Sequence, residues 1–359
     1  MKMRAYNFSA GPATLPEEVL KEAAAELVDY QGSGMSIMEM SHRGKEYSAV
    51  HEETIANIKE LLNIPEGYSV LFMTGGASSQ FALIPMNLLG EGQTADYTNS
   101  GAWAAKAIKE AKALGNVNIA ADCGKEIPTR VPTAEELQLT NDAAYLHITS
   151  NETISGAQWK TFPEHETLIA DMSSDILSRP LDVSKFGMIY AGAQKNLGPA
   201  GITLAIIKDE LADRCPDTVP TIMRYKTHIE NNSLYNTVPT FPVYMLCLVT
   251  RWLKAKGGLE GMQKLNAEKA AKLYAAIDGT DFYTGTAVKE FRSDMNVTWR
   301  LANEELEPVF IEEAAKQNLK GLKGHRSVGG IRASIYNAFP AEGIDALISF
   351  MKEFEAKHG

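Results

Sequence analysis

The chain has 359 residues, 45% apolar and 22% charged, and its 35 Lys and Arg against 45 Asp and Glu give a net charge of −10. This balance argues against a general nucleic-acid-binding protein, whose surface is basic, and also against anionic small ligands. The apolar runs are far shorter than the roughly 18 residues of a membrane span. The first residues, MKMRAYNFSAGPATLP, contain no apolar signal segment. We therefore expect a cytoplasmic protein that binds neither membrane nor nucleic acid.

The three cysteines, Cys123, Cys215 and Cys247, are odd in number and widely separated. They form neither a disulfide framework nor a CxxC metal pair. We therefore expect unpaired thiols in a reducing compartment, and no metal site.

Helical and strand patterns alternate through the first two thirds of the chain. Helices are expected at 16–30, 46–62 and 101–114, the last with Thr98-Asn99-Ser100 as its cap. Short apolar runs bounded by turn residues predict strands at 69–73, 144–149, 167–170, 188–191 and 202–207. Such runs suit strands buried on both faces of a largely parallel sheet, so we predict an open α/β fold.

The pattern changes near Gly257, where a long amphipathic helix begins. The remaining elements are expected as strands at 295–301 and 330–336 and helices at 305–318 and 342–357. We predict a large domain at 16–257 and a small α/β domain at 258–359, to which the N-terminal segment 1–15 is attached.

The segment TGGASSQ follows the strand at 69–73 and opens a helix. Adjacent glycines allow close backbone approach, and helix N-terminal amides favour phosphate. A plain strand-to-helix turn is the alternative. The segment matches neither the P-loop nor GxGxxG, which weakens the hypothesis of a nicotinamide-dependent oxidoreductase.

Two further strand ends carry charged residues. Asp171 ends the strand at 167–170, at the edge where α/β sheets bind ligands, although a helix N-cap would look the same. Lys195 follows the strand at 188–191 among small residues, whereas most lysines lie in solvent. A desolvated lysine has a lowered pKa and can attack an aldehyde.

Asp171 and Lys195 together are more specific than either alone. Pyridoxal phosphate needs a lysine for its Schiff base and an acid beside its ring nitrogen. It also needs a phosphate cup, which TGGAS can supply, and often a stacked aromatic ring. Trp103 is the candidate for that ring, with a place in the core as the alternative.

An ordered set of motifs extends along the chain. They are NFSAGPA at 7–13, SHRGKEY at 41–47, GGASSQF at 75–81, GAW at 101–103, NETISG at 151–156, ADMSSDILSRP at 170–180, YAGAQKNLGPAG at 190–201, LYNTVPTFP at 234–242 and GHRSVGGIRASIYNA at 324–338. On these motifs the sequence resembles the phosphoserine aminotransferase family, class-V pyridoxal-phosphate enzymes of the aspartate-aminotransferase-like fold (fold type I). The resemblance implies a large domain with a mostly parallel seven-stranded sheet flanked by helices, plus the smaller C-terminal α/β domain.

The resemblance also implies how the cofactor, pyridoxal 5'-phosphate, is held. Lys195 would form the Schiff base, Asp171 would pair with the ring nitrogen, and Trp103 would stack on the ring. Thr153 would hydrogen-bond the ring hydroxyl. The cofactor phosphate would be contacted by Gly76, Ala77, Gln194 and, from a neighbouring subunit, Asn236 and Thr237.

Substrates would be held at two basic poles of a site shared in a homodimer. Arg332 would hold the α-carboxylate. The distal anion would be held by His42 and Arg43, with His325 and Arg326 of the partner subunit. A guanidinium suits both carboxylate and phosphate, although each arginine taken singly could be a surface ion pair.

The implied reaction is reversible amino transfer from L-glutamate to 3-phosphohydroxypyruvate, giving O-phospho-L-serine and 2-oxoglutarate. It would serve serine biosynthesis, and related enzymes also handle 4-phosphohydroxy-L-threonine in vitamin B6 biosynthesis. One departure is Ala77, where some members carry Arg after the glycine pair, which puts the strength of the phosphate preference in doubt. The alternatives are alanine–glyoxylate transamination, cysteine desulfuration and a cofactor-binding regulator without turnover.

Overall fold

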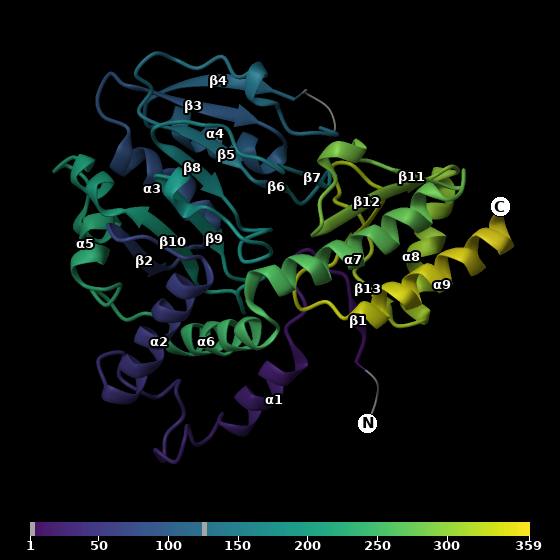
Figure 1. Cartoon of the computed structure of the whole chain (residues 1–359), viewed down its shortest axis with the longest axis horizontal. Helices are drawn as coiled ribbons and strands as arrows, with labels where there is room; N and C mark the ends of the chain where they lie inside the picture. Colours follow the sequence, from purple (N-terminus) through teal and green to yellow (C-terminus); the bar gives the residue numbers. More distant parts are fainter. Residues whose placement is uncertain (1–3, 124–127) are drawn as a thin grey trace.

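A computed structural model describes residues 4–123 and 128–359. A seven-stranded sheet forms the centre of its larger body (Figure 1). In order across the sheet, the strands are β2 (Tyr68–Met73), β10 (Thr203–Lys208), β9 (Met188–Gly192), β8 (Leu168–Asp171), β5 (Leu146–Thr149), β3 (Thr94–Asn99) and β4 (Asn116–Asp122). β10 is antiparallel to both neighbours and the other pairs are parallel. The prediction of a mostly parallel seven-stranded sheet is confirmed.

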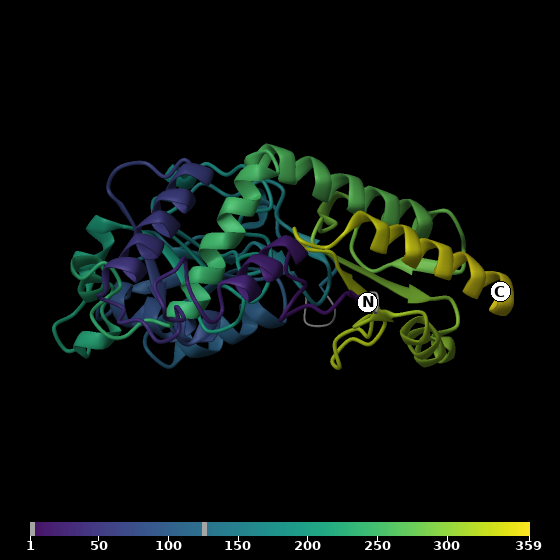
Figure 2. The same cartoon turned by 90° about the horizontal axis from the view of Figure 1, so that it is seen from below.

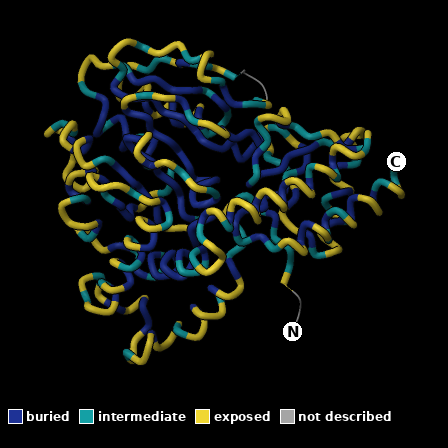
Figure 3. The backbone as a smooth tube through the Cα atoms, in the orientation of Figure 1, coloured by how far each residue is buried: buried dark blue, intermediate teal, exposed yellow. Residues whose placement is uncertain are grey.

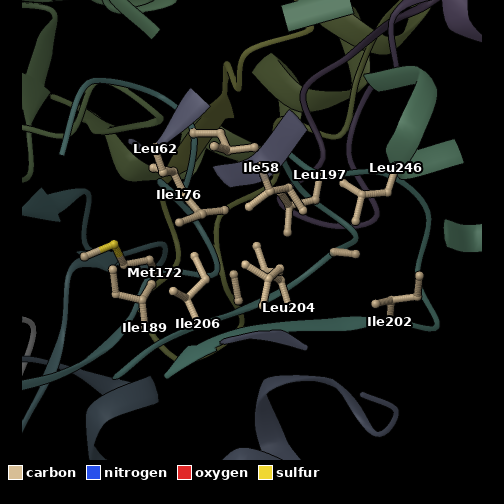
Figure 4. Packing of buried hydrophobic residues seen from close by; sticks show 14 of the residues in the cluster. Ile58, Leu62, Met172, Ile176, Ile189, Leu197, Ile202, Leu204, Ile206 and Leu246 are labelled. Atoms are coloured by element: carbon tan, nitrogen blue, oxygen red, sulfur yellow. The ribbon is translucent and has the colours of Figure 1, made fainter. Parts of the chain in front are cut away.

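The central strands are apolar on both faces because each face packs against its own layer. Along β10, Leu204 and Ile206 join one buried cluster while Ala205 and Ile207 join another, as the two-residue period of a strand requires. Figure 4 shows the first cluster, in which Leu204 and Ile206 lie with Ile58.

Helices cover both faces of the sheet. The first cluster takes residues from α2 (Lys45–Leu61) and α6 (Thr240–Ala255), which pack on each other. The second takes residues from α3 (Gly76–Leu88), α4 (Ala102–Lys112) and α5 (Tyr225–Glu230). Figure 3 shows the buried sheet enclosed by helices with exposed outer faces.

A smaller body carries the third cluster, around an antiparallel sheet of β11 (Tyr283–Gly285), β12 (Asn296–Leu301) and β14 (Ile331–Ser334). Its helices are α7 (Gly258–Asp278), α8 (Glu307–Lys316) and α9 (Ala341–His358), and α7 and α9 extend away from the large body (Figures 1 and 2). We propose the division near residue 257 that the sequence predicts. The burial of Phe8 in this third cluster supports the assignment of the N-terminal segment to it, and residues 1–3 of that segment lie outside the described residues.

Shorter elements complete the chain. The remaining strands are β1 (Tyr6–Asn7), parallel to β13 (Leu319–Lys320), and the hairpin of β6 (Asn151–Glu152) and β7 (Ala157–Gln158). Short 3₁₀ segments occupy Ala134–Glu136, Val183–Lys185, Asp209–Arg214, Thr221–Met223, Lys289–Phe291 and Glu304–Leu306. In the described part of the chain, no helix has the length and apolarity to cross a membrane.

Three sequence expectations differ from the structure. The first helix, α1 (Glu17–Ala25), ends five residues before the expected residue 30. β3 and β4 were not predicted, because their sequences TADYTN and NVNIAAD mix polar residues into a strand. Thr98 and Asn99 belong to β3 rather than to a cap, and Gly101 is the N-cap of α4.

Candidate active site

The candidate site lies where the large sheet's strands end. Asp171 ends β8, Thr149 ends the neighbouring β5, and Gly75 and Lys195 follow β2 and β9. Because these strands run the same way, their carboxyl ends meet at one edge, where α/β sheets bind ligands. A cavity of about 440 Å³ opens there, within the usual range for small-molecule sites.

Lys195, which the sequence predicts as the nucleophile, lines this cavity. Its Nζ donates a hydrogen bond to Oγ1 of Thr153 at 3.2 Å. Burial lowers the pKa of Lys195 to about 8, against the opposing charges of Asp171 and Glu152. A neutral amine is therefore available near neutral pH, as attack on an aldehyde requires.

Asp171 is a buried carboxylate in the same cavity. Its Oδ1 accepts a hydrogen bond from the backbone N–H of Ser173 at 2.9 Å. Burial raises the pKa of Asp171, against the Ser173 hydrogen bonds and the nearby Lys195 charge. A cationic N–H placed against this carboxylate would offset its desolvation, so the group is suited to hold a protonated ring nitrogen.

The N-terminus of α3 forms one wall of the cavity. Gly75 is its N-cap, with φ of 94°, and Gly76 has φ of 68°, values that glycine adopts without strain. No side chain caps the helix and no acid lies in its first turn. The amides of Gly76 and Ala77 are therefore available for a phosphate at the positive end of the helix dipole.

Trp103 lies in the first turn of α4 and lines the cavity. Lys106, one turn later, places its Nζ 3.9 Å from the centre of the Trp103 ring. Lys106 is exposed, and its contact with Trp103 was not predicted from the sequence. The spacing of three residues on a helix is the signal that could have found the pair.

Arg332, on β14 of the small body, lines the cavity. Its Nη1 lies 3.5 Å from the carbonyl oxygen of Thr153, and its buried Nε has no partner. None of the ion pairs found among residues 4–123 and 128–359 includes Arg332. Burial lowers the pKa of His325, and the charges of Arg332, Arg326 and Lys106 add to this effect. This end of the cavity is therefore positively charged and open to an anion.

The structure brings most of the predicted residues together. Those that line the cavity are Gly76, Ala77, Trp103, Thr153, Asp171, Gln194, Lys195, His325 and Arg332. His325 was expected from the partner subunit, and this is corrected: the segment that leads into β14 carries it into the cavity of its own chain.

The other predicted residues lie outside this cavity. They are His42, Arg43, Asn236, Thr237 and Arg326. Asn236 instead lines a separate cavity of about 380 Å³, on the other side of the Gly75 turn. Arg43 is exposed just before α2, and the buried Nε2 of His42 has no partner within the described chain.

Glu152 is a site residue that the sequence reasoning missed. It is fully buried, and its Oε1 accepts a hydrogen bond from the Ser100 hydroxyl at 3.0 Å. Burial raises its pKa to about 7, and its charge acts on Lys195. Its place in NETISG, directly before Thr153, was the available signal.

The residues present fit pyridoxal phosphate. Lys195 is the nearby cation that acts on the buried carboxylate of Asp171, and a protonated ring nitrogen would supply a second one. The uncapped amides at Gly76 suit a phosphate, and a carbon atom added to Gly76 would meet nothing within 4 Å, so this edge is open. Lys195 and the Trp103 ring face the same volume.

Comparison with known proteins agrees with this geometry. The family model for class-V aminotransferases matches residues 5–347. A phosphoserine aminotransferase from Niallia circulans is 56% identical over 362 aligned residues, covering 100% of both chains. The solved phosphoserine aminotransferase from Bacillus circulans subsp. alkalophilus has a TM-score of 0.98 at 56% identity over 99% of each chain. A PLP-bound phosphoserine aminotransferase from Trichomonas vaginalis has a TM-score of 0.94 at 42% identity, covering 97% of this chain and 100% of that one.

The chain therefore belongs to the class-V aminotransferase family. Within that family, its full-length relatives at 52–56% identity carry the name phosphoserine aminotransferase. The resemblance that the motifs indicated is confirmed.

Proposed function

We propose that the protein is a pyridoxal-phosphate-dependent phosphoserine aminotransferase. It moves the amino group of L-glutamate to 3-phosphohydroxypyruvate, reversibly, and yields O-phospho-L-serine and 2-oxoglutarate. The observation that carries the proposal is the meeting of Lys195, Asp171 and the unpaired Arg332 in one cavity. The reaction supplies serine biosynthesis.

Each side chain has a defined task. Bound pyridoxal phosphate supplies an electron sink for the substrate α-carbon. Asp171 keeps the ring nitrogen protonated, since a buried carboxylate binds a cationic N–H strongly. Lys195, with its pKa lowered to about 8, takes the proton from the α-carbon as a base and returns it as an acid. Trp103 and Thr153, which line the cavity, would hold the ring by stacking and by a hydrogen bond to its hydroxyl.

Both substrates carry an α-carboxylate and a distal anion, which explains a site with two basic poles. Arg332 binds the α-carboxylate through its fork of N–H donors. His325 contributes to the distal pole from the same chain, and the charge of Arg326, which lies outside the cavity, acts on His325. The charge of Lys106 also acts on His325. This chain has Ala77 at the position where some relatives of this type carry Arg.

We propose a homodimer in which each site is completed by its partner. In one chain His42, Arg43, Asn236 and Thr237 lie outside the cavity, so a second copy must present them if they act. The unsatisfied Nε2 of His42 supports this arrangement. These residues would reach the distal anion and the cofactor phosphate.

We also propose a cytoplasmic location. All three cysteines are free thiols, which fits a reducing compartment. Cysteine desulfuration, the alternative reaction, needs a reactive thiol at the site. None of them lines the cavity, and burial raises the pKa of Cys123 to about 12, so this alternative is disfavoured.

A spectroscopic experiment tests the proposal. The cofactor-loaded protein is mixed with single amino acids, and its visible absorbance is recorded. Bleaching by L-glutamate and by O-phospho-L-serine, but not by L-alanine, is expected. Bleaching by alanine alone would instead indicate a small-substrate aminotransferase, and no bleaching by any of them would indicate a regulator without turnover.

A further inference from the structure

A buried polar contact joins the small body to the turn that carries Lys195. Asn337, three residues beyond β14, is 6% exposed. Its backbone N–H donates to Oδ1 of Asn196 at 3.0 Å, and its Nδ2 donates to the carbonyl oxygen of Leu177 at 2.8 Å. Its own Oδ1 accepts from Nδ2 of Asn266, on α7, at 2.8 Å. Asn337 thus links segments from both bodies through one side chain.

The large-body partners of Asn337, Asn196 and Leu177, lie close in the chain to Lys195 and Ser174, which line the cavity. Asn196 directly follows Lys195, and its Nδ2 donates to the carbonyl oxygen of Ile176 at 2.9 Å. Leu177 has φ of 56°, a conformation in which a bulky side chain is rare. Such backbone persists only where its surroundings hold it, and the Asn337 amide bonds its carbonyl group. The turn after Asp171 and the turn at Lys195 are therefore tied to the same residue.

Lys269, one turn beyond Asn266 on α7, holds Asn337 from the other side. It is 5% exposed, and its Nζ donates to the carbonyl oxygens of Ile335, Tyr336 and Phe339 at 3.0, 2.7 and 3.2 Å. Burial lowers its pKa to about 7. No ion pair found in the described ranges includes Lys269, so its contacts are with main-chain oxygens that fix one loop.

We propose that Asn337 is a positioning residue for amino transfer. With Asn266 and Lys269, it forms a joint that sets Lys195 on the large body against Arg332 on the small body. The inference rests on the proposed function in one respect, that Lys195 and Arg332 act on the same substrate.

The reaction gives this joint its purpose. Arg332 fixes the α-carboxylate while Lys195 moves the proton of the adjacent carbon, so their separation decides whether the amine reaches its target. The direct contact between the bodies at this point, from Arg332 to the carbonyl of Thr153, is long at 3.5 Å. Asn196, beside Lys195, bonds Asn337 at 3.0 Å, five residues along the chain from Arg332. A misplacement of about 1 Å can cost on the order of 100-fold in rate.

The test compares three alanine variants of the cofactor-loaded protein. Asn337→Ala removes the two side-chain bonds of the joint, to Leu177 and Asn266, and keeps the main-chain bond to Asn196, whereas Asn266→Ala removes one of the two side-chain bonds. Asn87→Ala is the matched control: Asn87 is also buried, and its side chain bonds the backbone of Leu83, Met223 and Tyr225, none of which lines the cavity. The readouts are the pH dependence of the visible absorbance, the affinity for glutarate as an unreactive dicarboxylate, and the thermal midpoint.

Asn337→Ala is expected to weaken glutarate binding by about tenfold or more and to shift the absorbance titration by about half a pH unit or more. Asn266→Ala should give smaller changes in the same direction. Asn87→Ala should lower the thermal midpoint only. Neither the absorbance titration nor the glutarate affinity uses 3-phosphohydroxypyruvate, so a wrong substrate assignment would leave this result intact.

Unchanged glutarate affinity and an unchanged titration in a folded Asn337→Ala protein would overturn the proposal. If that variant does not fold, Asn266→Ala decides by the same two readouts. If neither variant folds while Asn87→Ala does, the joint acts through stability alone and the positioning role is wrong.

Discussion

Two features of Lys195 shift its pKa in opposite directions, namely its burial and the nearby carboxylates. Burial lowers its pKa to about 8, and Asp171 and Glu152 oppose that change. Below this pH the side chain is an ammonium and cannot attack an aldehyde. Above it the amine is free to attack, so the reactivity of Lys195 changes most steeply near pH 8.

Covalent capture of pyridoxal phosphate by the apoprotein should follow that pKa. The initial rate is expected to rise about tenfold from pH 7 to pH 9 and then to level off, because a group of pKa about 8 is mostly neutral by then. Borohydride trapping followed by peptide mass spectrometry measures the labelled fraction at Lys195. In Asp171→Asn the plateau should begin at lower pH, since a charge that raises the pKa is gone. A rate that keeps rising beyond pH 9 would contradict the burial of Lys195.

Arg332 is expected to serve both substrates alike. Arg332→Ala should raise KM for L-glutamate and for 3-phosphohydroxypyruvate by roughly 10- to 100-fold, the effect of about 1.5–3 kcal/mol per hydrogen bond to a charged group. Arg332→Lys should recover little of this loss, because an ammonium lacks the planar fork.

Steady-state assays with each substrate varied in turn would show this effect. Arg300→Lys, on the neighbouring strand and paired with Glu307, is the control and should alter stability without changing either KM. A defect confined to the phosphorylated substrate would mean that Arg332 does not hold the α-carboxylate, which both substrates share.

At the residue scale, the sequence indicated which residues carry the proposed chemistry better than it indicated how the folded chain brings them together. Lys195 and Asp171 were recognisable because their strand-end positions are local features of the chain. The place of His325 was not, because it depends on how β14 brings the small body to the cavity. Glu152 was missed because burial is what makes that carboxylate unusual.

At the scale of elements, the N-terminus of α4 is where a small change has a large effect. Gly101 is its N-cap, and a carbon atom added there would lie 2.5 Å from Oε2 of the buried Glu152. Glu152 is fixed from the other side by Ser100. The helix must therefore move if Gly101 acquires a side chain, and Trp103 in its first turn moves with it.

Gly101→Ala is expected to lower the free energy of unfolding by about 1–3 kcal/mol, as overpacking does. It should also weaken cofactor affinity, because the Trp103 ring leaves its place. Thermal denaturation of the apoprotein gives the first quantity, and fluorescence titration with pyridoxal phosphate gives the second. A destabilised variant with wild-type cofactor affinity would show that Trp103 does not stack on the ring.

The elements that the sequence predicted are those with one dominant pattern. β8, β9 and β10 are continuous apolar runs, because both faces of the sheet are covered. β3 is not a continuous apolar run. Its buried Asp96 accepts hydrogen bonds from Asn118 and Thr140, contacts that only the folded chain supplies. Its strand character comes from its neighbours rather than from its composition.

For the whole molecule, the net charge of −10 describes the outer surface and not the site. The cavity has Arg332, His325 and the N-terminus of α3 at its walls. Their field acts over a few ångströms in a low dielectric, whereas surface charges are screened by salt. An acidic protein can therefore bind the three anionic groups of a cofactor and its substrates.

The proposed shared site predicts that two defective chains, Lys195→Ala and Arg43→Ala, can form a dimer with one intact site. Lys195→Ala destroys the site that contains it, and kcat should fall by roughly 10²–10⁴-fold or more, the usual range for lost acid–base catalysis. Arg43→Ala should weaken the distal pole of whichever site Arg43 reaches. If Arg43 acts in the partner's site, a heterodimer of these two chains has one site with both defects and one site with neither.

Co-expression with two different affinity tags and sequential purification isolates this heterodimer. Its activity is expected to be about half that of the wild-type dimer, since one of two sites is intact. Unpurified random mixtures should reach about one quarter, because about half of the dimers are mixed. If Arg43 served its own chain, each site of the heterodimer would carry one defect, and activity would be about half that of the Arg43→Ala dimer. That result would reject the shared site while leaving Lys195 and Asp171 in their roles.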